Sequence, residues 1–147
     1  MRVRRMDPGT ELEVLRSGHL LEEPPELSAV RAYLSDDRNV FLAAYEGSEA
    51  VGFLRGTALT QLRSKRKRFF LEEIAVEESF RRRGAGKALI TSLLRDCREL
   101  GFEDVFVTVD PTNAPAVRLY LTTGALPEVA AERMFVYRLH SDIESPV

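Results

Sequence analysis

One segment, residues 69–109, constrains the fold of this chain more than any other. Strands are predicted over Phe69–Val76 and Phe102–Val109, and the spacing of apolar residues between them predicts a helix over Gly86–Leu100. The apolar stripe of this helix is formed by Leu89, Ile90, Leu93, Leu94, Cys97 and Leu100. Gly101 is expected to end the helix. A strand, a helix and a strand in this order form a right-handed crossover between two parallel strands. The chain is therefore expected to build an α/β fold.

The other predicted elements complete a mixed sheet. Strands joined by hairpin turns precede the crossover, so they are expected to pair antiparallel. The expected strands are Val3–Met6, Val40–Tyr45, Ala50–Leu62 and Met134–Leu139, the last paired with Leu126–Ala130. The expected helices run from Thr10, as N-cap, to Leu21, from Glu26 to Leu34 and from Asn113 to Thr123. We predict one domain over residues 1–140, a tail over residues 141–147, and a mixed, mostly antiparallel sheet flanked by about four helices.

Composition excludes several classes of protein. Of the 147 residues, 44% are hydrophobic and 30% are charged, which is typical of a folded domain and not of a disordered chain. The net charge of −2 argues against a nucleic-acid partner, and the basic run Arg63–Arg68 is expected to be a solvated loop. No apolar run is long enough to cross a membrane and Met1–Asp7 lacks the apolar region of a secretory signal, so a cytoplasmic location is expected. One cysteine, Cys97, and two distant histidines, His19 and His140, predict neither a disulfide nor a metal site.

A glycine-rich loop between the strand Phe69–Val76 and the following helix is the most informative motif. Residues 81–87 read Arg-Arg-Arg-Gly-Ala-Gly-Lys, which places backbone N–H groups and positive charge at a helix start, as a phosphate group requires. A Walker A loop needs glycine where Arg81 stands and Ser or Thr where Ala88 stands, so that motif is excluded. A dinucleotide-binding loop needs Gly or Ala in place of Leu89, and its strand ends closer to the glycines.

The loop and a second motif together carry a family resemblance. The loop follows the pattern Arg81-x-x-Gly84-x-Gly86. After the next predicted strand, residues 113–120 read Asn-Ala-Pro-Ala-Val-Arg-Leu-Tyr and are followed by Gly124-Ala125. In their order and context these motifs resemble the acetyl-coenzyme A loop and the second motif of the GNAT (GCN5-related N-acetyltransferase) superfamily.

The resemblance covers most of residues 39–139 and implies a cofactor and a site. It implies that the strands Phe69–Val76 and Phe102–Val109 form a central parallel pair that splays apart, with the pantetheine arm of acetyl-CoA in the gap. It implies main-chain contacts from Ile74 and Val76 to acetyl-CoA, a main-chain N–H near Val76 for the oxyanion, and no metal. The residues implied to bind acetyl-CoA are Ile74, Ala75, Val76, Arg81, Arg82, Arg83, Gly84, Ala85, Gly86, Lys87, Asn113, Ala116 and Tyr120.

Within the superfamily, the chain most resembles the aminoglycoside 3-N-acetyltransferase branch, in residues 41–52 and 109–110. In that branch a carboxylate lies immediately before the strand segment that contacts acetyl-CoA, and here that residue is Glu73. The resemblance implies that Glu73 is the general base for the acceptor ammonium and that Tyr120 is the general acid for the CoA thiolate. Strand alternation predicts that Glu72 points to the opposite face from Glu73, so only one of the two is expected to face the acceptor.

Other side chains are candidates for the acceptor side, each with an ordinary alternative. His19 could pair with Glu73 or relay a proton, or it could be a surface histidine. Asp110 could bind an ammonium group or cap the following turn. Negative charge at the acceptor mouth could come from Glu22, Glu23, Asp36 and Asp37, which could equally be polar helix ends. Cys97 is expected to fill the core rather than to carry an acyl group.

These features predict an enzyme that transfers acetyl directly from acetyl-CoA to a cationic amine. The 3-amino group of an aminoglycoside antibiotic is the preferred acceptor, with antibiotic resistance as the consequence. The alternatives are a polyamine, a small-molecule amine or a protein N-terminus as the acceptor, and a non-catalytic acyl-CoA-binding sensor. The apolar segment Ala130–Leu139 would permit a homodimer.

Overall fold

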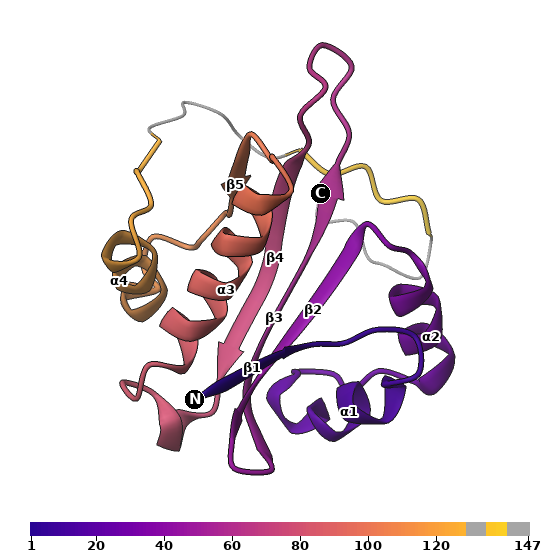
Figure 1. The fold of residues 1–147 in the computed structure, drawn as a ribbon, viewed down its shortest axis with the longest axis vertical. Coiled ribbons are helices and arrows are strands. Elements are labelled where there is room, and N and C mark those ends of the chain that lie inside the picture. Colours follow the sequence, from indigo (N-terminus) through magenta and orange to yellow (C-terminus); the bar gives the residue numbers. More distant parts are fainter. Residues whose placement is uncertain (129–134, 141–147) are drawn as a thin grey trace.

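Five strands form one mixed sheet in the computed structural model, which describes residues 1–128 and 135–140 (Figure 1). The strands are β1 (Arg2–Arg5), β2 (Asn39–Glu46), β3 (Glu49–Leu59), β4 (Arg68–Val76) and β5 (Asp104–Phe106). They lie in the order β1-β2-β3-β4-β5; the first four pair antiparallel, and β5 pairs parallel to β4. The predicted α/β fold with a mixed, mostly antiparallel sheet is confirmed, and the parallel pair lies at one end of the described sheet.

Helices cover both faces of the sheet (Figure 1). On one face lie α1 (Glu11–Arg16) and α2 (Leu27–Ser35), and on the other lie α3 (Ala85–Glu99) and α4 (Ala114–Thr122). Two short 3-10 helices, Gly18–Leu20 and Glu78–Phe80, follow α1 and β4. None of the helices within the described residues is both long enough and apolar enough to span a membrane.

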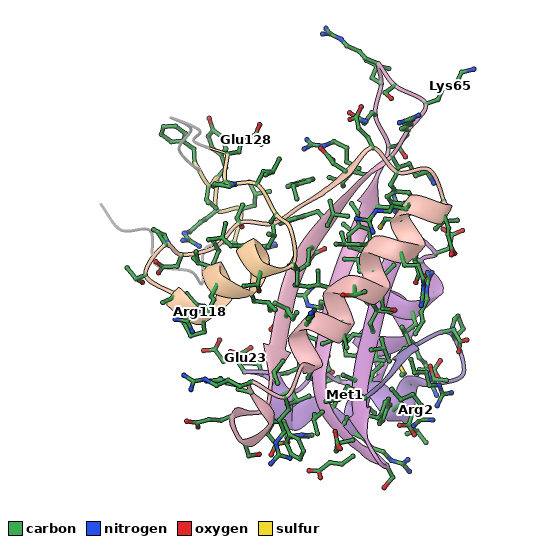
Figure 2. All side chains as sticks on the ribbon, turned by 60° about the vertical axis from the view of Figure 1, so that its left-hand side comes forward. Met1, Arg2, Glu23, Lys65, Arg118 and Glu128 are labelled. Atoms are coloured by element: carbon green, nitrogen blue, oxygen red, sulfur yellow. The ribbon has the colours of Figure 1, made fainter. Side chains whose placement is uncertain are left out.

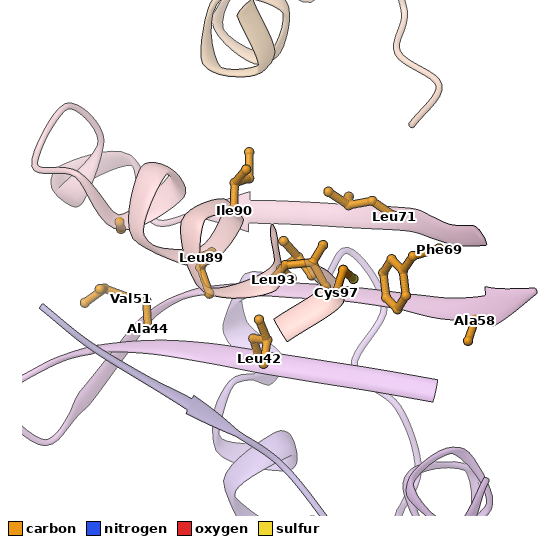
Figure 3. Close-up of a cluster of buried hydrophobic side chains, with 12 residues drawn as sticks. Leu42, Ala44, Val51, Ala58, Phe69, Leu71, Leu89, Ile90, Leu93 and Cys97 are labelled. Carbon is orange, nitrogen blue, oxygen red and sulfur yellow. The ribbon is translucent and has the colours of Figure 1, made fainter. Parts of the chain in front are cut away.

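The apolar stripe of α3 packs on the sheet as predicted (Figure 3). Leu89, Leu93 and Cys97 point toward the strands, where they meet Leu42 and Phe69. Cys97 is buried in this cluster, so its predicted role as a core residue is confirmed.

A second core lies between the opposite face of the sheet and the helices α1 and α2. Val14 and Val30 pack there against the rings of Phe41 and Phe53, which stack with their centroids 5.3 Å apart. The sheet is therefore buried on both faces, and side chains of its central strands that point away from one core point toward the other.

A β-bulge interrupts the pairing of β3 with β4. Arg55 pairs with Glu73 but the next residue, Gly56, pairs with Leu71, so Glu72 is the extra residue. Phe69 and Leu71 face α3 before the bulge, and Ile74 and Val76 face α3 after it. The alternation of side chains along β4 therefore shifts by one residue at Glu72.

The parallel strands β4 and β5 separate soon after they meet. They pair from Arg68–Asp104 to Phe70–Phe106, where the two phenylalanine rings stack 5.0 Å apart and Arg68 Nε donates a hydrogen bond to Asp104 Oδ1 at 2.7 Å. β4 continues to Val76 beyond this ladder, as the predicted splay requires. Strand structure ends at Phe106 rather than at the predicted Val109, because a strand needs a paired neighbour.

Three predicted elements differ from the structure: the first helix is shorter, and two strands near the end of the chain are absent from the described residues. The first helix ends at Arg16, and the hydroxyl of Thr10 does not cap it but accepts a hydrogen bond from Asp7 N at 2.9 Å and donates one to Asp7 O at 2.8 Å. Near the other end of the chain, residues 135–139 and 126–128 are not strands. Phe135 and Tyr137 are 84% and 91% exposed. Alternating apolar residues form a strand only when a neighbouring strand pairs with them. Residues 129, 130 and 134 of these predicted strands, and the predicted tail 141–147, lie outside the described residues.

Gly56 should be the least replaceable glycine of the sheet. A Cβ atom there would meet the carbonyl oxygen of Phe70 and would lie 2.6 Å from the Phe69 ring. Gly56→Ala is therefore expected to lower the free energy of unfolding by about 2–3 kcal/mol, measured by urea denaturation. Gly47→Ala is the control, because its Cβ would lie in open space and only the φ of +59° opposes it, at about 1 kcal/mol. Equal losses in the two variants would contradict the close packing at the bulge.

Candidate active site

The loop between β4 and α3 prepares an anion site at a helix N-terminus. Gly84 adopts a left-handed φ of +89° as the N-cap residue of α3, and Arg82 has a φ of +67°. The amides at the start of α3 have no partners within the helix and lie at the positive end of its dipole. A helix N-terminus rimmed by arginine and lysine binds a phosphate or pyrophosphate group.

This loop opens into a cavity of about 410 Å³ between β4, α3 and α4, here called the α3–α4 cavity. Most of the predicted acetyl-CoA residues line it: Ile74, Ala75, Val76, Arg81, Arg82, Gly84, Ala85, Gly86, Lys87, Asn113 and Ala116. Five residues that were not predicted to bind acetyl-CoA also line it, namely Phe80, Pro115, Arg118, Leu119 and Thr122. The motifs that are distant in sequence thus share one cavity.

One close packing contact and two hydrogen bonds shape the walls of the α3–α4 cavity. A Cβ atom on Gly86 would come within 2.9 Å of the Leu119 side chain, so glycine leaves room for this side chain of α4 at the start of α3. Asn113 is the N-cap of α4, and its Oδ1 accepts a hydrogen bond from Ala116 N at 3.2 Å. Arg81 Nε donates to the carbonyl oxygen of Val76 at 3.3 Å, which ties the loop to the end of β4. Figure 2 shows α4, with Arg118 labelled, standing apart from α3 beside the sheet.

Two predicted acetyl-CoA residues do not line this cavity. Arg83 instead lies over the Phe80 ring, with its guanidinium carbon 5.1 Å from the ring centroid. Tyr120 is half-buried against the α3 side of the core, and burial raises the pKa of its hydroxyl above the ordinary value. The phenol of Tyr120 therefore remains protonated at neutral pH, as a proton donor must.

A second cavity, of about 500 Å³, lies on the opposite face of the sheet under α1 and α2. We call it the α1–α2 cavity. Its apolar lining is Val14, Leu21, Pro25, Ala29, Val30 and Phe41, and its polar lining is Glu22, Glu23, Tyr33, Arg55 and Glu73. β4 separates the two cavities: Glu73 lines one, and the next residue, Ile74, lines the other.

The bulge brings Glu72 and Glu73 to one arginine, contrary to the prediction that they point to opposite faces. Arg55 Nη1 donates a hydrogen bond to Glu72 Oε2 at 2.8 Å, and Arg55 Nε donates one to Glu73 Oε2 at 2.7 Å. Simple alternation fails here because the extra residue in β4 resets the side-chain direction. Of the two carboxylates, Glu73 lines the α1–α2 cavity.

Burial lowers the pKa of Arg55, but the hydrogen bond to Glu73 and the charges of both carboxylates together raise it by more. The pKa of Arg55 therefore lies above its ordinary value. The guanidinium therefore remains charged. Neither Arg55 nor Tyr33 was predicted from the sequence, because their role depends on strand register and helix packing.

Two other predicted acceptor residues, His19 and Asp110, lie elsewhere. His19 Nε2 is 3.7 Å from Glu77 Oε2 and its Nδ1 is 3.1 Å from Arg16 O, so His19 does not form the pair with Glu73 that was one of its three alternatives. The 3-10 helix that carries His19 contacts β3, and the His19 side chain lies near Glu77, the residue that follows β4. Asp110 accepts hydrogen bonds from the amide and hydroxyl of Thr112 at 2.9 and 2.8 Å. These hydrogen bonds lower the pKa of Asp110. Of its two alternatives, Asp110 therefore caps the turn that follows it.

The remaining acidic candidates divide into two groups. Glu22 and Glu23 line the α1–α2 cavity, as predicted for the acceptor side. Asp36 does not line it: its carboxylate holds Arg38 at 2.8 Å in the turn before β2, and Asp37 also lies away from that cavity. Lys65 lies at the tip of the β3–β4 hairpin, which projects from the sheet (Figure 2). No group of three or more His, Cys, Asp or Glu in residues 1–128 and 135–140 is arranged to hold a metal ion.

A splayed mixed sheet, with a basic glycine loop on one side of β4 and a carboxylate cavity on the other, defines an acyltransferase-like architecture. The family model described as "Acetyltransferase (GNAT) family" matches residues 10–125. The chain belongs to the GNAT acetyltransferase family, as the sequence motifs predicted.

Curated relatives agree with this family. "N-acetyltransferase 8B" of Rattus norvegicus is 33% identical over 94 residues, which are 64% of this chain and 42% of that protein. "N-alpha-acetyltransferase" of Sulfurisphaera tokodaii is 30% identical over 99 residues, which are 63% of this chain and 59% of that protein. The chain thus matches less than half of the first relative and about three fifths of the second.

Solved structures share the fold over nearly the whole chain. An aminoglycoside acetyltransferase from an uncultured soil metagenomic sample, in complex with sisomicin, has a TM-score of 0.87 and 24% identity, covering 95% of this chain and 96% of its own. This match shows the fold. Aminoglycoside N-acetyltransferase AAC(6')-Iy in complex with CoA has a TM-score of 0.75 and 26% identity, covering 93% of each chain.

Cys97 should behave as an inert core thiol. Burial, followed by the charge of Asp96, raises the pKa of Cys97 to about 11. Little thiolate therefore exists at pH 8, and the native protein is expected to react with Ellman's reagent about 100-fold more slowly than the protein unfolded in guanidinium chloride. Reaction at the unfolded rate would contradict the burial of Cys97 and would reopen an acyl-enzyme route.

Proposed function

We propose that the protein is an acetyl-CoA-dependent N-acetyltransferase that acts on a primary amine of a cationic acceptor. One observation carries this proposal: two cavities of opposite charge meet at consecutive residues of β4, Glu73 and Ile74. The basic cavity suits a pyrophosphate, and the acidic cavity suits an ammonium group. Because only β4 separates the two cavities, an amine in the α1–α2 cavity could reach an acyl group held in the α3–α4 cavity.

The residues of the α3–α4 cavity fit acetyl-CoA. Arg81, Arg82, Lys87 and Arg118 offer positive charge, and the start of α3 offers backbone N–H groups for the pyrophosphate. Beyond its ladder with β5, β4 offers main-chain groups near Ile74 and Val76 to the pantetheine arm. Acetyl-CoA supplies an activated acetyl thioester.

Each step of the reaction can be assigned to a residue of this chain. Glu73 takes a proton from the acceptor ammonium, which frees the nitrogen lone pair for attack on the thioester carbonyl carbon. A main-chain N–H near Val76 stabilises the oxyanion. As the C–N bond forms and the C–S bond breaks, Tyr120 donates its hydroxyl proton to the departing sulfur. Tyr120 then regains a proton from the new amide nitrogen through water.

An aminoglycoside is the first candidate acceptor. Glu22, Glu23 and Glu73 give the α1–α2 cavity an excess of negative charge over Arg55, and a polyamine sugar carries several ammonium groups. The likeness to aminoglycoside acetyltransferases supports this choice. We retain the 3-amino group as the preferred position; the name AAC(6')-Iy makes the 6'-amino group the alternative to test.

A peptide α-amino group is the second candidate acceptor. Val14, Leu21, Val30 and Phe41 form an apolar wall in the α1–α2 cavity, which suits an amine on an apolar body better than a polyhydroxylated sugar. The relative named N-alpha-acetyltransferase supports this candidate.

The decisive experiment is CoA release from acetyl-CoA with a panel of amines, read with a maleimide dye. The panel contains kanamycin, gentamicin, spermidine and two short peptides that begin with Ala or with Leu. Saturable release with one class is expected, and mass spectrometry and NMR then locate the acetyl group. Glu73→Gln is expected to lower kcat about 100-fold or more, and Tyr120→Phe about 10- to 100-fold.

Each outcome of the panel has a distinct meaning. Release with an aminoglycoside supports the first candidate, and release with a peptide alone replaces it by the second. Release with spermidine alone assigns a polyamine. Binding of acetyl-CoA without release for any amine would overturn the proposed activity in favour of a non-catalytic acyl-CoA sensor. Full activity of both Glu73→Gln and Tyr120→Phe would overturn their assigned roles.

Gly84→Glu should weaken acetyl-CoA binding. The new side chain would bring negative charge and bulk to the N-terminus of α3, where the pyrophosphate is expected. We expect Kd to rise about 10- to 100-fold, since a like charge at this site costs a few kcal/mol, measured by isothermal titration calorimetry. Gly84→Ala is the matched control, because it meets the same φ of +89° without adding charge. Equal losses for Ala and Glu would assign the effect to backbone strain instead.

A further inference from the structure

Arg55 lies where it can control the proposed base. It is the residue of β3 that pairs directly with Glu73 in the β3–β4 ladder, immediately before the register shift. Its Nε and Nη1 atoms bind two carboxylates that follow each other in the chain, Glu73 at 2.7 Å and Glu72 at 2.8 Å. The exposed fractions of the Arg55, Glu72 and Glu73 side chains are 33%, 28% and 35%, so the cluster is partly shielded from solvent.

We infer that Arg55 is a positioning residue that holds the carboxylate of Glu73 toward the acceptor amine and supplies its counter-charge. This inference rests on the proposed function, because it assigns Arg55 a role through Glu73. It adds a residue that neither sequence motif contains.

The first part of the argument is electrostatic. The bulge places Glu72 and Glu73 on the same arginine, and two adjacent carboxylates repel each other unless a positive charge lies between them. Glu22 and Glu23 add further negative charge to the lining of the same cavity. Among the described lining residues Arg55 is the one cation, so its removal would leave the acidic cluster without that counter-charge and would favour protonation of one carboxylate.

The second part of the argument is geometric. The hydrogen bonds of Glu72 and Glu73 to Arg55 both use Oε2, which leaves Oε1 of Glu73 to receive the proton of the acceptor. A guanidinium fixes the plane of the carboxylates that it holds through two separate N–H groups. Lysine provides the charge but not this fork.

Tyr33 of α2 lines the same cavity as the cluster. Its hydroxyl donates to the carbonyl oxygens of Val40 and Gly56 at 2.9 and 3.1 Å, so it holds α2 over the bulge. Burial raises the pKa of Tyr33 to about 12, so it remains neutral in the pH range of any assay. Within residues 1–128 and 135–140, the charged groups that line this cavity with Glu73 are Arg55 from β3 and Glu22 and Glu23 from the segment before α2, and Glu72 from β4 binds the same arginine.

The test compares the pH dependence of kcat in Arg55→Met, Arg55→Lys and Arg55→Met/Glu72→Gln with that of the native protein. For Arg55→Met we expect kcat at pH 7 to fall about 10- to 100-fold and the acidic limb of the profile to move up by about one pH unit. Lysine should restore the position of the limb but only part of kcat. Removing the second carboxylate with Glu72→Gln should move the limb back toward its native position. A merely structural role of Arg55 would not give this reversal.

Arg68→Met is the matched control. Arg68 also joins neighbouring strands through an arginine–carboxylate pair, with Asp104 at 2.7 Å, but it lies at the start of β4, outside the lining of both cavities. Its loss should lower stability and leave the pH profile unchanged. The inference would be overturned by an unshifted profile in Arg55→Met, or by the same shift in Arg68→Met.

A second readout separates this inference from the proposed function. Carbon-13 NMR of the glutamate side-chain carboxyls reports their titration without any turnover. In Arg55→Met one carboxyl of the pair should titrate at a higher pH than in the native protein, and unchanged titration would overturn the inference. If Glu73→Gln keeps full activity while this NMR shift is present, the catalytic role of Glu73 fails but the electrostatic role of Arg55 stands.

Discussion

The single extra residue in β4 determines how the rest of the site is arranged. Without the bulge at Glu72, strict alternation would carry Glu73 to the α3 face along with Phe69 and Leu71. With the bulge, Ile74 and Val76 cover the α3 core while Glu73 points into the α1–α2 cavity. The bulge thus lets one strand serve an apolar core, an acidic cavity and a basic cavity within a few residues.

A glycine makes room for the bulge, and an arginine neutralises the charge of the two glutamates that the bulge brings together. Gly56 lies opposite the bulge, where any side chain would meet the backbone of Phe70 and the ring of Phe69. Arg55, its neighbour, supplies the positive charge that two adjacent glutamates require. The pair Arg55-Gly56 therefore combines a steric and an electrostatic condition, and a change in either would alter the direction or the charge of Glu73.

Sequence reasoning predicted what depends on local patterns. The stripe of α3 and the glycine loop are contiguous, so spacing alone located them, and the Asn113 motif joined them in the α3–α4 cavity. The bulge was missed because the strand Phe69–Val76 reads as apolar on both sides of Glu72, and no local signal marks the slip. A pair of adjacent glutamates inside an apolar strand, with an Arg-Gly pair on the preceding strand, is the signal that could have indicated it.

Long-range contacts explain the other differences. The partner of Glu73 lies 18 residues away in the chain, so it follows from strand register. The first helix ends at Arg16, before His19, and His19 lies near Glu77 rather than near Glu73. The alternation in residues 135–139 predicted a strand, but alternation only specifies which side chains could share a face. Pairing decides whether the strand forms, and pairing cannot be read from one segment.

The two cavities also separate charge across the sheet. Arg81, Arg82 and Lys87 lie on the α3 side of β4, whereas Glu22, Glu23 and Glu73 lie on the α1–α2 side. An anionic donor and a cationic acceptor would each be attracted to a different face, and neither would compete for the other's cavity. Salt weakens the attraction of the exposed arginines more than that of the partly buried cluster around Arg55. The arginine that lines the acidic cavity is therefore the exception to the pattern, and its two short hydrogen bonds to carboxylates account for its presence there.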